Sequence, residues 1–139
     1  MHRFLWLLIF ICLYGCQTAI LKEDLPQLNG YWEITLVEFP DGSSKAYSVN
    51  TSIDYIALKE DQGYRKKVQP NLDGSFRTSD DAEVFTVHWK EGQCWLHYKN
   101  GLNTHEERLI QLSPDAFAMK NAANIVYHYK KYQTINITP

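Results

Sequence analysis

Several features that define large protein classes are scarce or missing in this chain of 139 residues. Three cysteines are too few for a disulfide-rich scaffold, and no hydrophobic run reaches the roughly 18 residues that a membrane-spanning helix needs. The 14 basic residues do not outnumber the 16 acidic ones, and a formal charge of −2 argues against binding to nucleic acid. No repeat of fixed period is visible, which excludes a solenoid.

Apolar and aromatic residues are what the sequence has in quantity. Hydrophobic residues make up 45% of the chain and aromatic residues 14%, beside only 22% charged residues. Intrinsic disorder requires the opposite balance, with few aromatic residues and a high net charge. The length then allows one packed domain and hardly two.

The N-terminal segment 1–15 has the pattern of a secretory signal peptide. A short basic start precedes an apolar run, 4–14, that is too short to span a bilayer as a helix. Residues 13–16, Leu-Tyr-Gly-Cys, resemble the lipobox of bacterial lipoproteins, in which the cysteine becomes acylated. The alternative is an ordinary signal peptide cleaved nearby, with Cys16 incidental.

The lipobox resemblance implies an anchor in the cell envelope. Gln17 is not the aspartate that retains lipoproteins at the inner membrane, so we expect lipidated Cys16 to anchor the protein in the outer membrane, on its periplasmic or cell-surface side. More than one acyl chain on a single terminus gives stable anchoring. The expected divisions are a signal peptide (1–15), a lipidated cysteine with its tether (16–27), a folded domain (28–133) and a C-terminal tail (134–139).

Beyond the tether, short runs rich in β-branched and aromatic residues alternate with turn residues. A turn or single helical loop at 25–28 precedes the first run. We expect strands at 30–39, 46–49, 52–59, 64–69, 75–78, 83–90, 93–99, 102–112, 116–120 and 125–132. The pattern predicts an all-β, antiparallel up-and-down meander of about eight strands, closed into a barrel or folded into a sandwich.

Two hairpins determine the expected register in the middle of the chain. A two-residue turn at 91–92, Glu-Gly, pairs Trp89 with Cys94, and a turn at 100–101, Asn-Gly, then pairs Cys94 with Glu107. The inner face that results carries Phe85, Val87, Trp89, Cys94, Leu96, Tyr98, Asn103, His105, Glu107 and Leu109. Polar residues on an otherwise apolar face are expected where a barrel holds a ligand or water.

The start of the first strand resembles the lipocalin superfamily. That family begins with a turn of helix and then Gly-x-Trp, whose tryptophan plugs the closed end of an eight-stranded barrel, and Gly30 and Trp32 occupy these positions. Residues 108–120 are similar to a hairpin of small bacterial lipocalin-like lipoproteins. The Thr-Asp-Tyr motif is missing from the middle of the chain. A lysine, Lys130 or Lys131, stands where larger members place an arginine over the tryptophan.

The resemblance implies a cup for a small hydrophobic molecule at the barrel mouth, without catalysis and without a cofactor. The candidate ligand-binding residues are Phe85, Trp89, Cys94, Leu96, Tyr98, Asn103, His105 and Glu107. The alternative is a filled barrel that acts as a protein-interaction or structural module of the envelope. An open, apolar-lined cavity of several hundred cubic ångströms distinguishes the first hypothesis from the second.

Cys94, His105 and Glu107 allow a second chemistry if they meet. A thiolate, an imidazole and a carboxylate can ligate zinc, or can form a nucleophile with its base and orienting group. This requires the three side chains to lie within ligand or hydrogen-bond distance of one another. Otherwise Cys94 is a small core residue.

Two further groups of residues are expected on polar surfaces. His88 and His97 share the outer face of the central hairpin, as a pH-sensitive or metal-binding pair or simply as a solvated surface. The basic run 65–67 either contacts lipid headgroups near the anchor or protects an edge strand from aggregation.

Overall fold

The described part of the chain, residues 19–79 and 81–134 of a computed structural model, is built almost entirely from strands. Its elements are a 3-10 helix η1 (Lys22–Leu28) and the strands β1 (Gly30–Glu38), β2 (Ser44–Ala46), β3 (Ile53–Lys59), β4 (Gln62–Pro70), β5 (Phe76–Thr78), β6 (Glu83–Lys90), β7 (Gln93–Asn100), β8 (Asn103–Leu112), β9 (Ala116–Asn121) and β10 (Val126–Lys131). The predicted all-β fold is confirmed. Within these residues, no helix is long and apolar enough to cross a bilayer.

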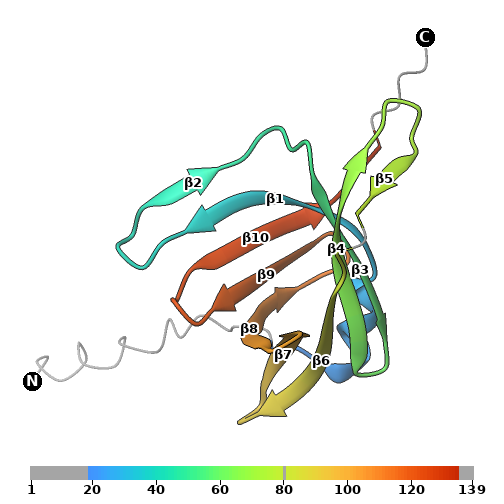
Figure 1. Ribbon diagram of the computed structural model, residues 1–139. Coiled ribbons are helices and arrows are strands. Elements are labelled where there is room, and N and C mark those ends of the chain that lie inside the picture. The colour runs from blue at the N-terminus through green and yellow to red at the C-terminus, as the bar shows by residue number, and fades with distance from the viewer. Residues whose placement is uncertain (1–18, 80, 135–139) are drawn as a thin grey trace, which may run out of the picture.

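Eight of the strands form a closed antiparallel barrel. The order along the sheet is β10-β9-β8-β7-β6-β4-β3-β1, and β10 also pairs with β1 to complete the ring (Figure 1). The two short strands are not part of the ring. β2 pairs antiparallel with β1, and β5 pairs antiparallel with β4. A meander closed in this way, with a turn of helix before its first strand, is a lipocalin-like fold. The choice between barrel and sandwich is thereby decided.

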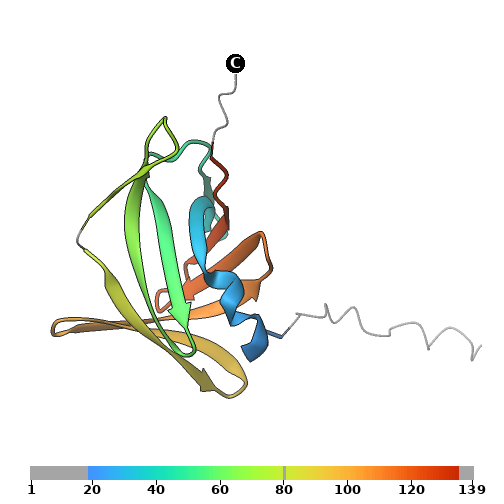
Figure 2. The ribbon, with the colours of Figure 1, turned by 90° about the vertical axis from the view of Figure 1, so that its right-hand side faces the viewer.

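The end of the barrel next to η1 is closed by packed side chains. Figure 2 shows η1 there, away from the tip of the β4–β5 hairpin. Trp32 is fully buried with Leu28, and its Nε1 donates a hydrogen bond to the Leu28 carbonyl at 2.8 Å. The Nζ of Lys131 lies 4.6 Å from the centre of the Trp32 ring and donates to the Asn29 carbonyl at 2.9 Å. Of the two candidate lysines, Lys131 is therefore the one over the tryptophan.

Residues 22–27 belong to the folded domain and are not a free tether. Leu25 of η1 is only 3% exposed and lies in the core, and Ile20 packs against it. The domain boundary expected at residue 28 is therefore too late, because an apolar pair spaced by three residues, Leu25 and Leu28, covers the end of the barrel. Cys16 and the rest of the segment 1–18 lie outside the described residues, as do residue 80 and residues 135–139.

The first of the two central hairpins has the predicted register. Glu91 and Gly92 form a two-residue turn with positive φ at both positions, 52° and 74°, and Trp89 pairs with Cys94. Two positive φ angles match the right-handed twist of the flanking strands, which is why this turn closes without a bulge.

The second hairpin turn lies one residue later than expected, at Gly101 and Leu102. Only Gly101 takes a positive φ, 61°, and it occupies the first turn position. Cys94 consequently pairs with Leu109 and not with Glu107. The register differs from the prediction by two residues, and a shift of two leaves every side chain of β8 on its expected face.

The half of the barrel interior next to η1 is filled by its own side chains. Fully buried residues from opposite walls meet there, among them Trp32, Phe85, Leu96, Tyr98, Phe117 and Met119. Trp32 and Phe117 pack edge to face with ring centres 4.8 Å apart, and Phe117 stacks on Tyr129 at 4.6 Å. Such pairs contribute about 0.5–1.5 kcal/mol each beyond the area they bury.

Candidate functional site

In the half of the barrel away from η1, the interior opens into a pocket that we call the mouth pocket. Its volume is about 480 Å³. It is lined by Asp54, Arg65, Lys66, Lys67, Asp81, Glu83, His105, Glu107, Asn121, Tyr127 and Tyr129. Seven of these eleven residues are charged, whereas the hydrophobic-ligand hypothesis expects a lining of mainly apolar residues.

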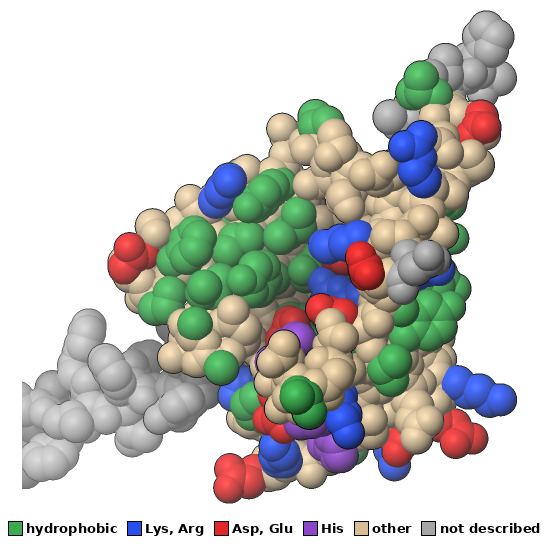
Figure 3. Space-filling view, viewed as in Figure 1, with side chains coloured by type: hydrophobic (Ala, Val, Ile, Leu, Met, Phe, Trp, Pro, Cys, Tyr) green, Lys and Arg blue, Asp and Glu red, His purple; other side chains and the backbone are tan. Residues whose placement is uncertain are grey.

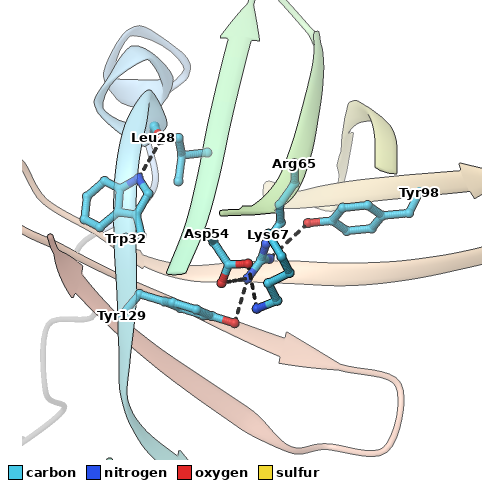
Figure 4. A network of polar contacts seen from close by, with 7 residues as sticks. All are labelled: Leu28, Trp32, Asp54, Arg65, Lys67, Tyr98 and Tyr129. Atoms are coloured by element: carbon cyan, nitrogen blue, oxygen red, sulfur yellow. Dashed lines mark hydrogen bonds and ion pairs between the residues drawn. The ribbon is translucent and has the colours of Figure 1, made fainter. Parts of the chain in front are cut away.

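A buried arginine forms the floor of the mouth pocket. Arg65 lies on the inner face of β4, and its side chain is only 10% exposed. Figure 4 shows it reaching between the walls of the barrel. Its Nη2 donates to the Tyr129 hydroxyl at 2.6 Å and to Asp54 Oδ2 at 3.1 Å, and its Nη1 donates to the Tyr98 hydroxyl at 3.4 Å.

Asp54 of β3 is the counter-ion of two cations. Its second oxygen, Oδ1, lies 2.7 Å from Lys67 Nζ, and the residue is 2% exposed (Figure 4). Burial alone would raise the pKa of Asp54, but Arg65 and Lys67 outweigh it and hold this pKa below its usual value. The carboxyl group is therefore ionised at neutral pH.

The two tyrosines of the network remain protonated while the arginine remains charged. Burial raises the pKa of Tyr129 to about 12, and it also raises the pKa of Tyr98. Burial opposes the charge on Arg65, yet the two tyrosines together with Asp54 and Glu107 hold its pKa well above the ordinary value. The floor of the pocket is therefore a fixed ionic network over the whole physiological pH range.

The opposite wall of the mouth pocket carries a carboxylate. Glu107 of β8 pairs with Asn121 of β9 and is half-buried. Among the described residues, its side chain makes no ion pair or hydrogen bond. His105, two residues before it, stacks on Tyr98 with ring centres 4.6 Å apart. Asn121 donates to the Tyr127 hydroxyl at 3.4 Å.

An apolar surface adjoins the mouth pocket. Figure 3 shows hydrophobic side chains gathered over β1, β10 and β9, directly beside the charged groups of the mouth. Tyr127, which lines the pocket, pairs with Val37 of β1. We call this surface over β1, β10 and β9 the apolar flank. The pocket and the flank together offer a charged end and an apolar end to one molecule.

Most residues predicted to bind a ligand belong to the core. Four of them are at most 1% exposed and are packed in the core: Phe85, Cys94, Leu96 and Tyr98. Trp89 packs against the core from a partly exposed position, and Asn103 is exposed where β8 begins. Only His105 and Glu107 line the mouth pocket. The alternation of apolar residues predicted the inner face, but it carries no information on how far the core fills the barrel.

Cys94 does not join His105 and Glu107. Cys94 pairs with Leu109, whereas His105 lies opposite a residue four positions further along β7, roughly 13 Å away at 3.3 Å per residue. The metal or nucleophile hypothesis for these three residues is therefore wrong. Burial raises the pKa of Cys94 to about 11, so the thiol is neutral. In residues 19–79 and 81–134, no group of three His, Cys, Asp or Glu is placed to hold a metal ion.

The two central members of the site, Arg65 and Asp54, are not among the residues predicted from the sequence. The basic run 65–67 predicts a surface position for Arg65, whereas the structure places it inside the barrel. The available signal was the period of two along β4, which puts Arg65 on the face of Gly63 and Lys67. Lys66 points to the outer face, where its Nζ lies 5.8 Å from the ring centre of Tyr55.

His88 and His97 lie on the outer face of the β6–β7 hairpin, away from the mouth pocket. Their ring centres are 5.9 Å apart. His97 Nδ1 lies 3.2 Å from Glu106 Oε1, and Lys90 Nζ lies 3.0 Å from the same oxygen. His97 thus contacts the Lys90–Glu106 ion pair on that face, and His88 packs against the His97 ring.

This chain is similar to several solved structures. No protein-family model matches it, and no curated protein matches it in sequence. A lipocalin-like protein from Bacteroides uniformis and an uncharacterized protein from Bacteroides eggerthii each align with 12% identity and a TM-score of 0.47, over 76% of this chain and 99% of theirs. Lobster apocrustacyanin A1 aligns with 8% identity and a TM-score of 0.44, over 79% of this chain and 64% of its own.

Proposed function

We propose that this protein is a non-catalytic binding protein that takes a small amphipathic molecule in the mouth pocket. One observation carries the proposal: a pocket of about 480 Å³ has a buried Arg65–Asp54 network as its floor and an apolar surface at its rim. Pockets of this volume are typical of small-molecule sites. The polar part of the ligand lies in the pocket, and its hydrophobic part lies on the apolar flank.

The cost of the ionic floor supports a functional role for it. Taking two charges out of water costs several kcal/mol per ion, and apolar residues of similar volume are often as stable in such positions or more so. The half of the barrel next to η1 already packs with apolar side chains alone. A charged layer between that core and the open mouth is therefore better explained by recognition of a ligand than by stability.

The proposal includes the lipid anchor expected from the sequence. We propose that acylated Cys16 holds the barrel at the outer membrane, with the mouth pocket accessible from the periplasm or the cell surface. Ile20, which packs against the core, lies four residues after Cys16 in the sequence, so the connection can span at most about 14 Å. The η1 end of the barrel then lies against the membrane surface.

A filled barrel acting as an interaction module is the second candidate function. The observation that favours it is the packed half of the interior next to η1, which leaves no room for a ligand among Phe85, Leu96 and Tyr98. In this case the apolar flank contacts a protein partner, and the mouth pocket holds only solvent.

Mass spectrometry of the full-length protein, purified from its own envelope in a mild detergent, tests both parts of the proposal. Under denaturing conditions, we expect a mature chain that begins at Cys16 and carries the mass of attached acyl groups. Under native conditions, we expect an additional small mass that is lost on denaturation. An unmodified Cys16 contradicts the anchor. A clean ligand-free mass, with no uptake from an envelope extract, favours the interaction module.

A further inference from the structure

We propose that the ligand of the mouth pocket carries a positively charged amine, and that Glu107 is its counter-ion. This inference rests on the proposed function, because it names the class of molecule that the same pocket binds. It follows from which charges in the pocket already have partners and which do not.

The positive charges in the lining are already engaged. Arg65 donates to Asp54, Tyr129 and Tyr98, so three of its donors are in use. Lys67 pairs with the other oxygen of Asp54. Lys66 lies on the outer face of β4, where its Nζ is within 6 Å of two tyrosine ring centres. Asp54 thus neutralises one of the two cations inside the pocket.

The negative charges of the lining outnumber the positive ones. Three carboxylates of the lining, Asp81, Glu83 and Glu107, make no ion pair with another described residue. Counted over the whole lining, four carboxylates face three cations, which leaves a formal charge of about −1 on the pocket when His105 is not counted. A pocket with this balance attracts a cation and repels a carboxylate.

Of these three carboxylates, Glu107 is the best placed to bind the amine of a ligand. Asp81 is exposed at the rim, and Glu83 lies directly across from Arg65 in the β4–β6 ladder. Glu107 is half-buried on the far wall and projects inward between His105 and Leu109. An unpaired carboxylate in such a position has lost part of its hydration without gaining a hydrogen bond, and an ammonium group would supply one.

The aromatic groups beside Glu107 suit the remainder of an amine ligand. Tyr127 and Tyr129 line the same pocket, and both lie on β10, one of the strands under the apolar flank. An aromatic or short alkyl group attached to the amine can therefore leave the charged floor and lie against Tyr127. The expected ligand is therefore an amine that carries an apolar group.

Three probes that share a phenylethyl group test the inference by isothermal titration calorimetry on the full-length protein in non-ionic detergent. They are 2-phenylethylamine, which is cationic, 3-phenylpropanoate, which is anionic, and 2-phenylethanol, which is neutral. We expect the amine to bind at least tenfold more tightly than the alcohol, and the carboxylate to bind more weakly than both. This difference corresponds to one charge-assisted hydrogen bond.

Two matched variants locate the interaction. Glu107→Gln keeps the shape of the side chain and removes its charge, so it should abolish the preference for the amine. Glu106→Gln is the control, because Glu106 is the neighbouring residue on the outer face, paired with Lys90 and His97. It should leave the preference unchanged. Far-ultraviolet circular dichroism verifies that both variants fold.

The outcomes separate this inference from the proposed function. Tighter binding of the carboxylate than of the amine overturns the amine assignment, while the binding function stands. Equal binding of all three probes likewise overturns the amine assignment and leaves the binding function standing. An amine preference that survives in Glu107→Gln overturns the role of Glu107. Failure of every probe to bind, together with a ligand-free native mass, overturns the proposed function itself.

Discussion

At the scale of single residues, the position of a charge along a strand decides its role. Arg65 and Lys66 are neighbours in the sequence, yet one is a buried hydrogen-bond donor inside the barrel and the other lies over tyrosine rings outside it. Asp54 compensates Arg65, and neither residue is stable in the interior without the other. Removal of one member of such a pair leaves an uncompensated buried charge.

Asp54→Asn should therefore destabilise the protein by about 3 kcal/mol at pH 7. The folded-state pKa of Asp54 is depressed, so its contribution to stability is present above the unfolded-state value of about 4 and is lost as the pH falls through the folded-state value. The gap between wild type and variant should shrink below pH 4. Urea unfolding at pH 7, 5 and 3 measures this difference.

Asp61→Asn provides the control for that measurement. Asp61 is exposed, and only its backbone carbonyl makes a tertiary hydrogen bond, to the Val87 amide at 2.7 Å. Its substitution should change the free energy of unfolding by less than about 0.5 kcal/mol at each pH. Equal effects of the two substitutions would mean that Asp54 does not stabilise Arg65.

At the scale of elements, the closure of the barrel depends on close contacts between neighbouring strands. The tightest of these contacts is at Gly63 of β4, where the neighbouring atoms leave no room for a side chain. A Cβ atom at this position would lie 2.6 Å from the Ala57 carbonyl oxygen and 2.6 Å from the Phe85 ring. The ring can move aside, but the carbonyl belongs to the β3–β4 hairpin and cannot move without disturbing the strand pairing.

Gly63→Ala should accordingly cost about 2–3 kcal/mol of stability, as overpacking of a core does. Gly74→Ala is a suitable control, because Gly74 has a positive φ of 86° but no heavy atom within 4 Å of the added Cβ. Its cost should be about 1 kcal/mol, from backbone strain alone. Chemical denaturation of both variants tests the comparison, and a smaller effect at Gly63 would show that the strands can separate to accept the methyl group.

The strands were largely predictable, and the site was not. Turn residues and alternation located β6, β7 and β8 within about one residue, because these signals are local. The register of β8 was misjudged because Asn-Gly can place its glycine at either turn position, and here Gly101 takes the first. The burial of Arg65 was not predicted because a run of three basic residues is typical of an exposed surface. Its burial depends on Asp54 and Tyr129, which reach it only in the folded barrel.

At the scale of the whole molecule, the barrel divides into a packed half and an open half. The half next to η1 holds the apolar core, and the other half holds the charged pocket and the apolar flank (Figures 1 and 3). An anchor at Cys16 would hold the packed half at the membrane and leave the pocket free to exchange its ligand. Ligand binding is therefore expected only at the end of the barrel away from η1.

If the ligand binds in the mouth pocket and not in the barrel interior, chemical-shift mapping of the isotopically labelled protein during titration with 2-phenylethylamine will show where. We expect the largest shifts on the amides of Arg65, His105, Glu107, Asn121 and Tyr127, and no change at Leu96 and Cys94. Shifts centred on Phe85, Cys94 and Leu96, or on the outer face around His88 and Trp95, would contradict binding in the mouth pocket.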